Sequence, residues 1–280
     1  MIITGEKIQE LTDHTIITYG QYYADEQLKR INCQYTYFDK NQPVKELSNN
    51  IQNAKSIFVY THILDFFFEK IYPLRKDPFV LVTHNSDEII TNQYIKYLND
   101  FKIKKWFAQS INVIHPKLIA IPAGLANSQW PHGNLKLFNE IMIENNPKNN
   151  LIYKNFNIDT SENHRSSVAR QTPTILLTRN RTQIDYWRDI SSSLFNICPM
   201  GNGIDSHRVW ESLYLKSIPI ITNCINNNGY SELPILSIPI DGWNIITPNF
   251  LYEKHKEIQQ KKHNYEKLDL NYWREQIKNG

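Results

Sequence analysis

Short apolar runs alternate with amphipathic patterns along most of the chain. A strand buried in a parallel sheet is a continuous apolar run, whereas a helix that covers a sheet has apolar positions on one face. The runs that predict strands are 15–19, 35–38, 56–60, 79–83, 103–108, 118–121, 151–156, 174–178, 195–199, 218–222 and 235–239. The patterns that predict helices are 25–32, 44–53, 63–71, 92–99, 161–170, 184–192, 206–216, 250–261 and 272–277. This alternation predicts an α/β fold with parallel sheets flanked by helices.

Two Rossmann-like domains with a central cleft are the simplest architecture for this pattern. The chain has 280 residues, a length at which about two domains are expected. Turn residues without clear periodicity at 124–134 mark a hinge. We therefore expect one domain over 1–128 and a second over 129–280. The alternative is one large sheet with a long surface loop.

The segment 194–222 carries the clearest functional pattern. Its apolar run is followed by a loop that contains Gly201, Asn202 and Gly203, and then by a helical pattern. Glycines in such a loop allow positive backbone angles and the close approach of a ligand. The segment is therefore interpreted as strand, glycine loop, helix and second strand, an arrangement typical of a nucleotide-diphosphate pocket.

The helix after this loop presents charged side chains near its start. Ser206 or Asp205 is placed to cap it, and Arg208 and Glu211, three residues apart, share one face. Helix N–H groups and a guanidinium suit a pyrophosphate, and a carboxylate one turn further can accept both hydroxyls of a ribose. The alternative is an ordinary surface pair, with glycines that only turn the chain.

The same segment resembles the C-terminal signature of exostosin-like glycosyltransferases. The residues that match are Pro199, Gly201, Ser206, Arg208, Glu211, Leu213 and Pro219. A looser likeness to microbial or viral members extends to 83–87 and 105–109. The resemblance implies a GT-B-like enzyme whose second domain binds a nucleoside-diphosphate sugar through Arg208, Glu211 and the loop, and whose first domain presents an acceptor. It also implies no cofactor and activity without a metal.

Two positions depart from the family pattern. Met200 stands where many exostosin-like chains have a basic residue, and Lys216 stands where a small residue is usual. The first departure removes one cation from the expected phosphate site. Arg179 or Arg181, which follow the predicted strand 174–178, are placed to supply it. The alternative is that both arginines are solvated.

Polar residues directly follow the predicted strand 79–83. A glycosyltransferase that inverts the sugar needs a base for the acceptor hydroxyl, and Asp87, Glu88 or His84 is a candidate, with Asn85 beside them on the acceptor side. The alternative is that Ser86 or Asp87 caps a helix that begins near Glu88.

Two further side chains are candidates for the acceptor side. Trp106 is placed to stack on a sugar, although a tryptophan in an apolar run is more often core. His132, near the hinge, is placed to touch phosphate or acceptor, or to be an exposed loop residue.

Composition narrows the functional classes. A net charge of +3 without a basic tract gives no indication of nucleic-acid binding. The histidines are dispersed, Asp-x-Asp is absent and the cysteines Cys33, Cys198 and Cys224 are not at ligand spacing, so we expect no metal site. We find no signal peptide or membrane span, so we expect a soluble protein of the cytoplasm, or of the host cytoplasm if viral.

The partners expected are a nucleotide-sugar donor and a glycan or other hydroxyl acceptor. The alternative is a nucleotide-sugar- or glycan-binding protein without catalysis.

Overall fold

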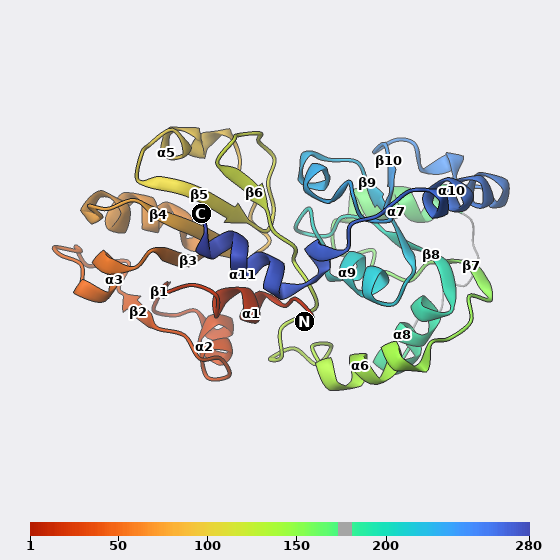
Figure 1. Cartoon of the computed structure of the whole chain (residues 1–280), viewed down its shortest axis with the longest axis horizontal. Coiled ribbons are helices and arrows are strands. Elements are labelled where there is room, and N and C mark those ends of the chain that lie inside the picture. Colours follow the sequence, from red (N-terminus) through yellow and green to blue (C-terminus); the bar gives the residue numbers. More distant parts are fainter. Residues whose placement is uncertain (173–180) are drawn as a thin grey trace. The chain divides into compact units, whose positions relative to one another are not determined.

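Two compact units make up the chain. The computed structural model describes residues 1–172 and 181–280. The first unit contains Met1–Trp130 and Lys267–Gly280, and the second contains Pro131–Glu266. Each unit has its own parallel sheet, of six strands in the first and four in the second (Figure 1). The predicted α/β class with two Rossmann-like domains is therefore confirmed.

The first sheet has the strand order β2-β1-β3-β4-β5-β6, and every pair in it is parallel. Its strands are β1 (His14–Thr18), β2 (Tyr35–Phe38), β3 (Ser56–Tyr60), β4 (Phe79–His84), β5 (Ile103–Ala108) and β6 (Leu118–Ala120). The chain moves outward from β1 to β2 and then crosses to β3 on the other side. The carboxyl ends of β1 and β3 therefore form the topological switch point, where open α/β sheets bind ligands.

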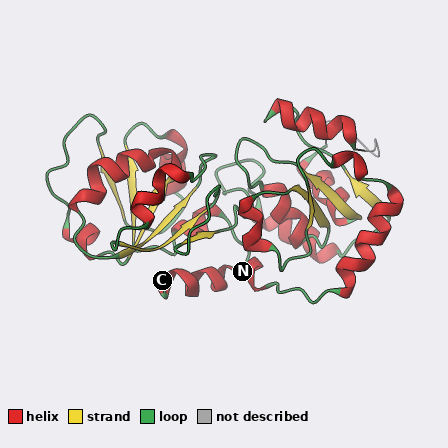
Figure 2. Ribbon diagram, turned by 90° about the horizontal axis from the view of Figure 1, so that it is seen from above, coloured by secondary structure: helices red, strands yellow, loops and turns green. Residues whose placement is uncertain are grey.

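Helices cover both faces of this sheet (Figure 2). They are α1 (Gly5–Gln9), α2 (Tyr22–Leu28), α3 (Asn49–Asn53), α5 (Ile95–Leu98) and α11 (Leu270–Lys278), with a 3₁₀ turn η4 (Asn92–Tyr94). Successive residues of β5 point to opposite faces: Trp106 packs against Phe68, and Phe107 packs against Trp273 of α11. Both faces are thus closed, which explains why β5 appears as an apolar run.

The predicted helix 63–71 is instead a run of short irregular turns. Its parts are η1 (Thr61–Ile63), α4 (Leu64–Phe66), the π-helical turn η2 (Phe67–Ile71) and η3 (Tyr72–Leu74). Pro73 lies in η3 and lacks the N–H that a regular helix needs there, while Phe68 of the π-helical turn stacks on Tyr97 at 3.7 Å between ring centroids and also packs against Tyr72.

The C-terminal helix α11 belongs to the first unit, although the predicted boundary left it in the second. The amino group of Met1 lies 3.0 Å from the Asp269 carboxylate, and the Leu270 N–H donates to the Met1 carbonyl. The buried Trp273 ring packs on Phe107. The chain therefore returns to the sheet where it began, a tertiary pairing that no local pattern reveals.

The second sheet has the strand order β10-β9-β8-β7 and is also parallel. Its strands are β7 (Asn150–Tyr153), β8 (Ser193–Cys198), β9 (Ile218–Thr222) and β10 (Leu236–Ile238). Its helices are α6 (Leu135–Glu144), α7 (Glu162–Gln171), α8 (Gln183–Ser191), α9 (His207–Tyr214) and α10 (Pro248–Gln260), with 3₁₀ turns η5 (Ile225–Tyr230) and η6 (Trp243–Ile245); a further turn, η7 (Glu266–Leu268), begins at the end of this unit. The predicted strand 174–178 lies outside the described residues.

Alternate residues of β8 serve two different interfaces. Phe195 and Ile197 belong to the apolar core, together with Trp243 of η6 and Leu251 of α10. On the other face Asn196, which is wholly buried, donates to Ser212 Oγ of α9 at 2.8 Å. This polar contact orients α9 against the sheet.

Among the described residues, no helix has the length and apolar content that a membrane span requires.

Gly5 lets α1 approach the end of β4 closely. A Cβ at this position would lie 1.8 Å from Asn85 Oδ1 and 2.8 Å from His84 Nδ1. Asn85 Oδ1 already accepts a hydrogen bond from Asn127 Nδ2 at 3.0 Å. The site has no space for a methyl group unless α1 moves and this bond breaks.

We expect Gly5→Ala to destabilise the protein by about 3 kcal/mol or more, because it overpacks the site and leaves polar groups without partners. In an open helix the same change would stabilise by about 1 kcal/mol. Urea unfolding followed by tryptophan fluorescence measures the change. The control is Gly20→Ala, where no atom lies within 4 Å and only the positive φ of +84° is strained, at a cost of about 1 kcal/mol. Equal losses would contradict the contact argument.

Candidate functional site

The glycine loop and the start of α9 follow β8 at the carboxyl edge of the second sheet. The Gly201 N–H donates to the Gly203 carbonyl at 3.1 Å, which closes a tight turn. Asp205 accepts from the Ser206 N–H and from Trp210 Nε1, so the loop is tied to the helix that follows. Ser206 precedes the first residue of α9 in an extended conformation, as an N-cap residue does. The predicted strand, loop and helix are therefore present in that order.

Arg165 of α7 lies under this loop, although the sequence analysis did not select it. Its Nε donates to the Met200 carbonyl at 2.9 Å, and its Nη1 donates to the Asn157 carbonyl at 2.7 Å. Asn157 follows β7 and Met200 follows β8, so one buried guanidinium joins the carboxyl ends of two strands. Gly201 makes this possible, because a Cβ there would lie 2.8 Å from Arg165 Nη2.

Arg208 adds a second guanidinium nearby, in the first turn of α9. Burial and the positive charge of Arg208 both lower the pKa of Arg165, to about 10. Neither arginine lies within 4.0 Å of a carboxylate in the described part of the chain, and residues 173–180 include no Asp or Glu. The two cations are close together, and neither is within ion-pair distance of a carboxylate among the described residues, although the buried Glu211 carboxylate interacts electrostatically with Arg208.

Two polar atoms at the start of α9 are buried without a hydrogen-bond partner among the described residues. They are Arg208 Nε and Ser206 Oγ. Buried polar groups are normally bonded, so such atoms mark a place where a ligand or water binds. Together with the helix N-terminus and the two guanidinium groups, they form a site suited to a dianion such as a diphosphate.

Glu211 does not have the environment that its predicted role requires. Its carboxylate is buried and accepts from Trp187 Nε1 and from the Tyr186 hydroxyl, both at 2.9 Å. A ribose would have to displace these two bonds from α8. In this structure Glu211 instead fixes Tyr186, and nearby Tyr186, Cys198 and Glu211 outweigh burial and raise the pKa of Arg208.

Among the described residues, the basic side chain beside Met200 is Arg165 of α7 and not Arg181. Arg179 lies outside the described residues. Arg181 is exposed and forms an ion pair with Asp189, with Nε 2.9 Å from the carboxylate. Arg165 gave little signal in the sequence, because no fixed spacing relates it to Met200. The one feature of the sequence that could have indicated Arg165 is its position early in the helix that follows β7, near the edge of the sheet where ligands bind.

Of the remaining loop residues, Asn202 is exposed and Gly203 is buried.

His84 and Asn85 are structural in this fold, which corrects the catalytic role predicted for His84. His84 Nε2 lies 2.9 Å from the Pro122 carbonyl oxygen, so it donates a proton there. His84 Nδ1 accepts from the Asn85 N–H at 2.8 Å, so its basic lone pair is already used. Nδ1 also lies 3.0 Å from Asn85 Oδ1, and the side chain is buried, so both ring nitrogens are engaged within the protein and neither is offered to an acceptor hydroxyl.

Asn85 is held on every side by other buried amides. Its backbone has a positive φ of +58°, and its N–H donates to Gln109 Oε1 at 3.0 Å. Its side chain bonds to Asn127 and Gln9. Asn85 therefore supports the end of β4 and does not offer its side chain to an acceptor.

The other predicted acceptor-side residues are separated. Asp87 is exposed in the loop after β4, and the helix expected near Glu88 is absent there; Ser86 Oγ instead accepts from the Glu88 N–H within the loop. Trp106 is wholly buried and donates to Thr83 Oγ1 at 2.9 Å, so it belongs to the core and not to an acceptor groove. His132 lies in the second unit, exposed, with its ring 6.4 Å from that of His207.

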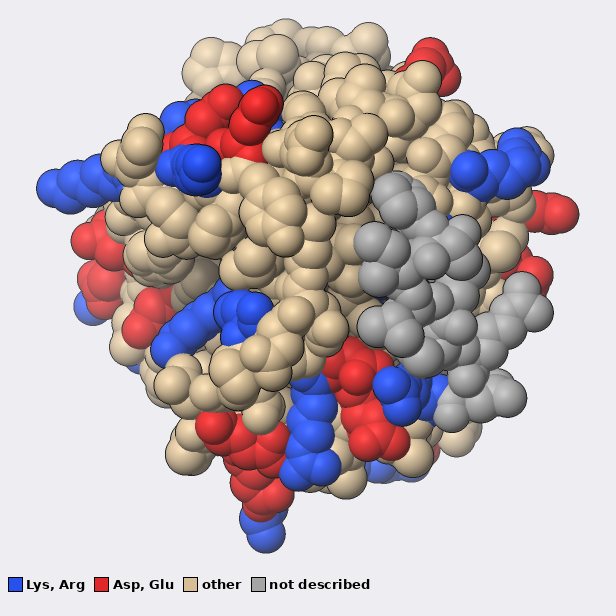
Figure 3. All heavy atoms as spheres, turned by 90° about the vertical axis from the view of Figure 1, so that its right-hand side faces the viewer, with Lys and Arg blue, Asp and Glu red and all other residues tan. Residues whose placement is uncertain are grey.

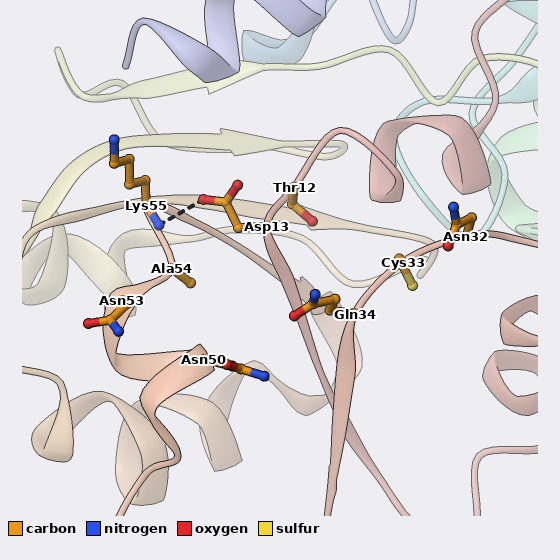
Figure 4. A pocket seen from close by; sticks show the side chains of 9 residues that line it. All are labelled: Thr12, Asp13, Asn32, Cys33, Gln34, Asn50, Asn53, Ala54 and Lys55. Atoms are coloured by element: carbon orange, nitrogen blue, oxygen red, sulfur yellow. Dashed lines mark hydrogen bonds between the residues drawn. The ribbon is translucent and has the colours of Figure 1, made fainter.

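A pocket of about 630 Å³ lies at the amino ends of β1, β2 and β3 (Figure 4). Asp13 Oδ2 accepts there from the N–H groups of Lys55 and Ser56, at 2.8 and 2.9 Å, so its charge ties a loop to β3. This edge is opposite the one where parallel sheets bind ligands. The pocket therefore carries no functional assignment.

The charged groups outside these sites give no further candidate. On the face shown in Figure 3, the Lys and Arg side chains are interspersed with Asp and Glu. Within residues 1–172 and 181–280, no group of three His, Cys, Asp or Glu side chains is placed to hold a metal ion.

Comparison with models of known protein families and with curated protein sequences found no match for this chain. The likeness to exostosin-like enzymes therefore rests on the motif residues alone.

We expect Glu211→Ala to cost about 2–5 kcal/mol of stability, because it leaves the buried Trp187 N–H and Tyr186 hydroxyl without an acceptor. Chemical denaturation measures this loss. The control is Glu144→Ala, which removes an exposed ion pair with Arg188 worth about 0–1 kcal/mol. If both variants were equally stable, Glu211 would have no structural role.

Proposed function

We propose that this protein is a glycosyltransferase that moves a sugar from a nucleoside-diphosphate sugar to a hydroxyl acceptor. In this proposal the diphosphate binds between Arg165, Arg208 and the N-terminus of α9. The alternative is a protein that binds the same donor without turnover.

The observation that carries the proposal is the pair of neighbouring arginines, neither of which has a carboxylate within ion-pair distance among the described residues and of which only Arg208 interacts electrostatically with a carboxylate, that of Glu211. Two guanidinium groups held together cost free energy unless an anion compensates them, because like charges repel more strongly in a partly buried site. Arg165 is held by two backbone carbonyls and cannot move away from Arg208 without breaking those bonds. A bound diphosphate carries the charge and the several acceptor oxygens that such a pair requires.

The position of the pair in the fold supports the same proposal. Both arginines lie at the carboxyl edge of a parallel sheet, beside a glycine loop and a helix N-terminus. This is where α/β folds bind nucleotides. The motif shared with exostosin-like enzymes includes Arg208, Ser206 and Gly201, which all contribute to this site.

The chemistry proposed for the site is stabilisation of the leaving group. As the bond from the sugar to the diphosphate breaks, negative charge develops on the diphosphate oxygen. Fixed guanidinium groups stabilise that charge without reorganising. Because the two arginines supply positive charge, we propose that donor binding does not need a metal ion.

Asp87 remains the proposed base for the acceptor. It is exposed in the loop after β4, at the carboxyl edge of the first sheet. His84 is no longer a candidate because both of its ring nitrogens are bonded.

The alternative, a donor-binding protein without catalysis, is favoured by one observation. The end of β4 is a closed network in which His84 and Asn85 are bonded within the fold, so neither of these two neighbours is available to orient Asp87 as a base. Measurement of turnover separates the two proposals.

We expect Arg165→Ala and Arg208→Ala each to weaken donor binding about 10- to 100-fold, the effect of losing a charge-assisted hydrogen bond. Thermal-shift titration with UDP-, GDP-, ADP- and CMP-sugars measures this, in EDTA and in Mg²⁺. A donor at one hundred times its dissociation constant stabilises the native state by about 2.7 kcal/mol. The matched control is Arg181→Ala, which removes an exposed arginine of the same unit and should bind like the wild type. Absence of any shift with the wild type, or an equal loss in Arg181→Ala, would refute the site.

We expect Asp87→Asn to keep donor affinity and lose release of the nucleoside diphosphate by about 100-fold or more, the contribution of a general base. Enzyme-coupled detection of the diphosphate follows the reaction. Donor binding by the wild type with no release of diphosphate, alone or with any acceptor, would support the binding protein.

A further inference from the structure

An aromatic platform lies at the carboxyl end of β1 in the first unit. Tyr22, Tyr23 and Trp130 contact one another in it, and Tyr19 precedes them directly after β1; the three tyrosines are 66% (Tyr19), 69% (Tyr22) and 60% (Tyr23) exposed. Tyr23 packs on Trp130 with ring centroids 4.8 Å apart and contacts Tyr22 at 5.6 Å. Large aromatic side chains exposed next to one another are unusual on a monomer surface and mark interaction sites.

The platform is fixed from below by the fold. The Tyr19 ring stacks on Tyr37 of β2 at 5.0 Å and 14°, and the Tyr37 hydroxyl donates to Asp25 of α2. The segment before Trp130 is bonded to α2, where Asn127 Nδ2 donates to Gln27 Oε1 at 3.2 Å. The Tyr19 ring and the segment that leads to Trp130 are therefore held in place before a ligand binds, which lowers the entropy that binding costs.

The platform also lies at the topological switch point of the sheet. Tyr19 directly follows β1, and Gly20 turns the chain into α2 with a φ of +84° and no atom within 4 Å of its Cβ position. Because β2 and β3 lie on opposite sides of β1, the chain diverges here. Such crevices bind ligands in open α/β sheets.

Two amide oxygens beside the platform lack a hydrogen-bond donor among the described residues, although both amide nitrogens are bonded. Gln21 stands between Tyr19 and Tyr22, and Gln129 precedes Trp130; the Oε1 atom of each is buried without a hydrogen bond. Gln21 Nε2 donates to Thr18 Oγ1 at 2.7 Å. Rotation of that amide would exchange the two groups but would still leave one of them unbonded. A ligand with hydroxyl groups satisfies either arrangement.

The charges beside the rings identify the class of ligand. Asp25 and Glu26 lie on α2 next to the tyrosines, and the neighbouring Lys29 is paired with Glu26. A nucleic acid needs uncompensated cations for its phosphates, which this surface does not concentrate. A neutral sugar presents an apolar C–H face to an aromatic ring and hydroxyl groups at its rim.

We propose that this platform of Tyr19, Tyr22, Tyr23 and Trp130 binds a glycan and that this glycan is the acceptor class of the proposed transferase. The identification of the glycan as an acceptor rests on the proposed function. The binding of a glycan does not, because the platform and the arginine pair are in different units.

The tryptophans of the chain provide a specific probe. Trp106, Trp187, Trp210, Trp243 and Trp273 are all buried, whereas Trp130 is partly exposed. Acrylamide should therefore quench mainly the fluorescence of Trp130, and Trp130→Phe should remove that quenchable fraction. The probes are hexasaccharides of β-linked glucose, β-linked N-acetylglucosamine and α-linked mannose, with oligo(dT) as the competing class.

We expect at least one hexasaccharide to protect Trp130 from acrylamide in the wild type. Tyr23→Ala should raise the dissociation constant about tenfold, the effect of one stacking ring. The matched control is Tyr252→Ala, an exposed tyrosine of α10 in the second unit, which should bind as the wild type does. Circular dichroism confirms that both variants are folded.

Protection by oligo(dT) alone, protection by none of the three hexasaccharides, or an equal effect of Tyr23→Ala and Tyr252→Ala would overturn the platform. A sugar-nucleotide thermal shift tests the arginine pair separately. Glycan protection without any donor shift would leave the platform and remove the transferase, whereas a donor shift without glycan protection would do the reverse.

Discussion

The contact on which the candidate site depends is the one between the Arg165 guanidinium and two backbone carbonyls. By donating to the oxygens of Asn157 and Met200, Arg165 holds the segments after β7 and β8 together. Gly201 must then lack a side chain, because Arg165 Nη2 occupies the space that its Cβ would need. The same bonds keep Arg165 close to Arg208. Carbonyl oxygens are neutral acceptors, so they do not cancel the positive charge of the guanidinium. Arg165 therefore both fixes the loop and provides a positive charge that can bind an anion.

In the first unit, neutral amide side chains hold the loops at the ends of the strands, whereas in the second unit a charged guanidinium does so. Gln9 Oε1 accepts from Gln27 Nε2 and from the Tyr60 hydroxyl, while Asn127 bridges Gln27 and Asn85. These bonds are satisfied by one another, and they fix α1 and the loop after β4 without leaving a group for catalysis. Satisfied networks of this kind make a fold specific and rigid. The groups proposed to bind a ligand in this unit are instead the exposed rings around Tyr19 and Tyr23. The amide network supports them through its contact with Gln27 of α2.

The strands were predictable because a buried parallel strand must be apolar on both faces. Those from 35–38, 56–60 and 103–108 appear within the predicted bounds. Two helices were not predicted, α1 and α6. The first is only five residues long, and the second begins directly after the turn-rich hinge segment, where its apolar periodicity was not recognised. The predicted helix 63–71 is irregular in the structure: it runs into Pro73, and Phe68 within it packs on Tyr97 of a distant segment.

For the candidate site, the sequence alone determined the order of strand, glycine loop and helix, and with it the position of Arg208 and Ser206 at the start of α9. These features are local, since residues a few positions apart on a helix or a turn have a fixed relation in space. The tertiary structure decided the rest. It brought Arg165 from α7 to Met200, enclosed Glu211 between Tyr186 and Trp187, and buried His84 and Trp106. Such contacts join residues far apart in the chain, and their partners are chosen by the packing of whole elements, which no spacing along the sequence encodes.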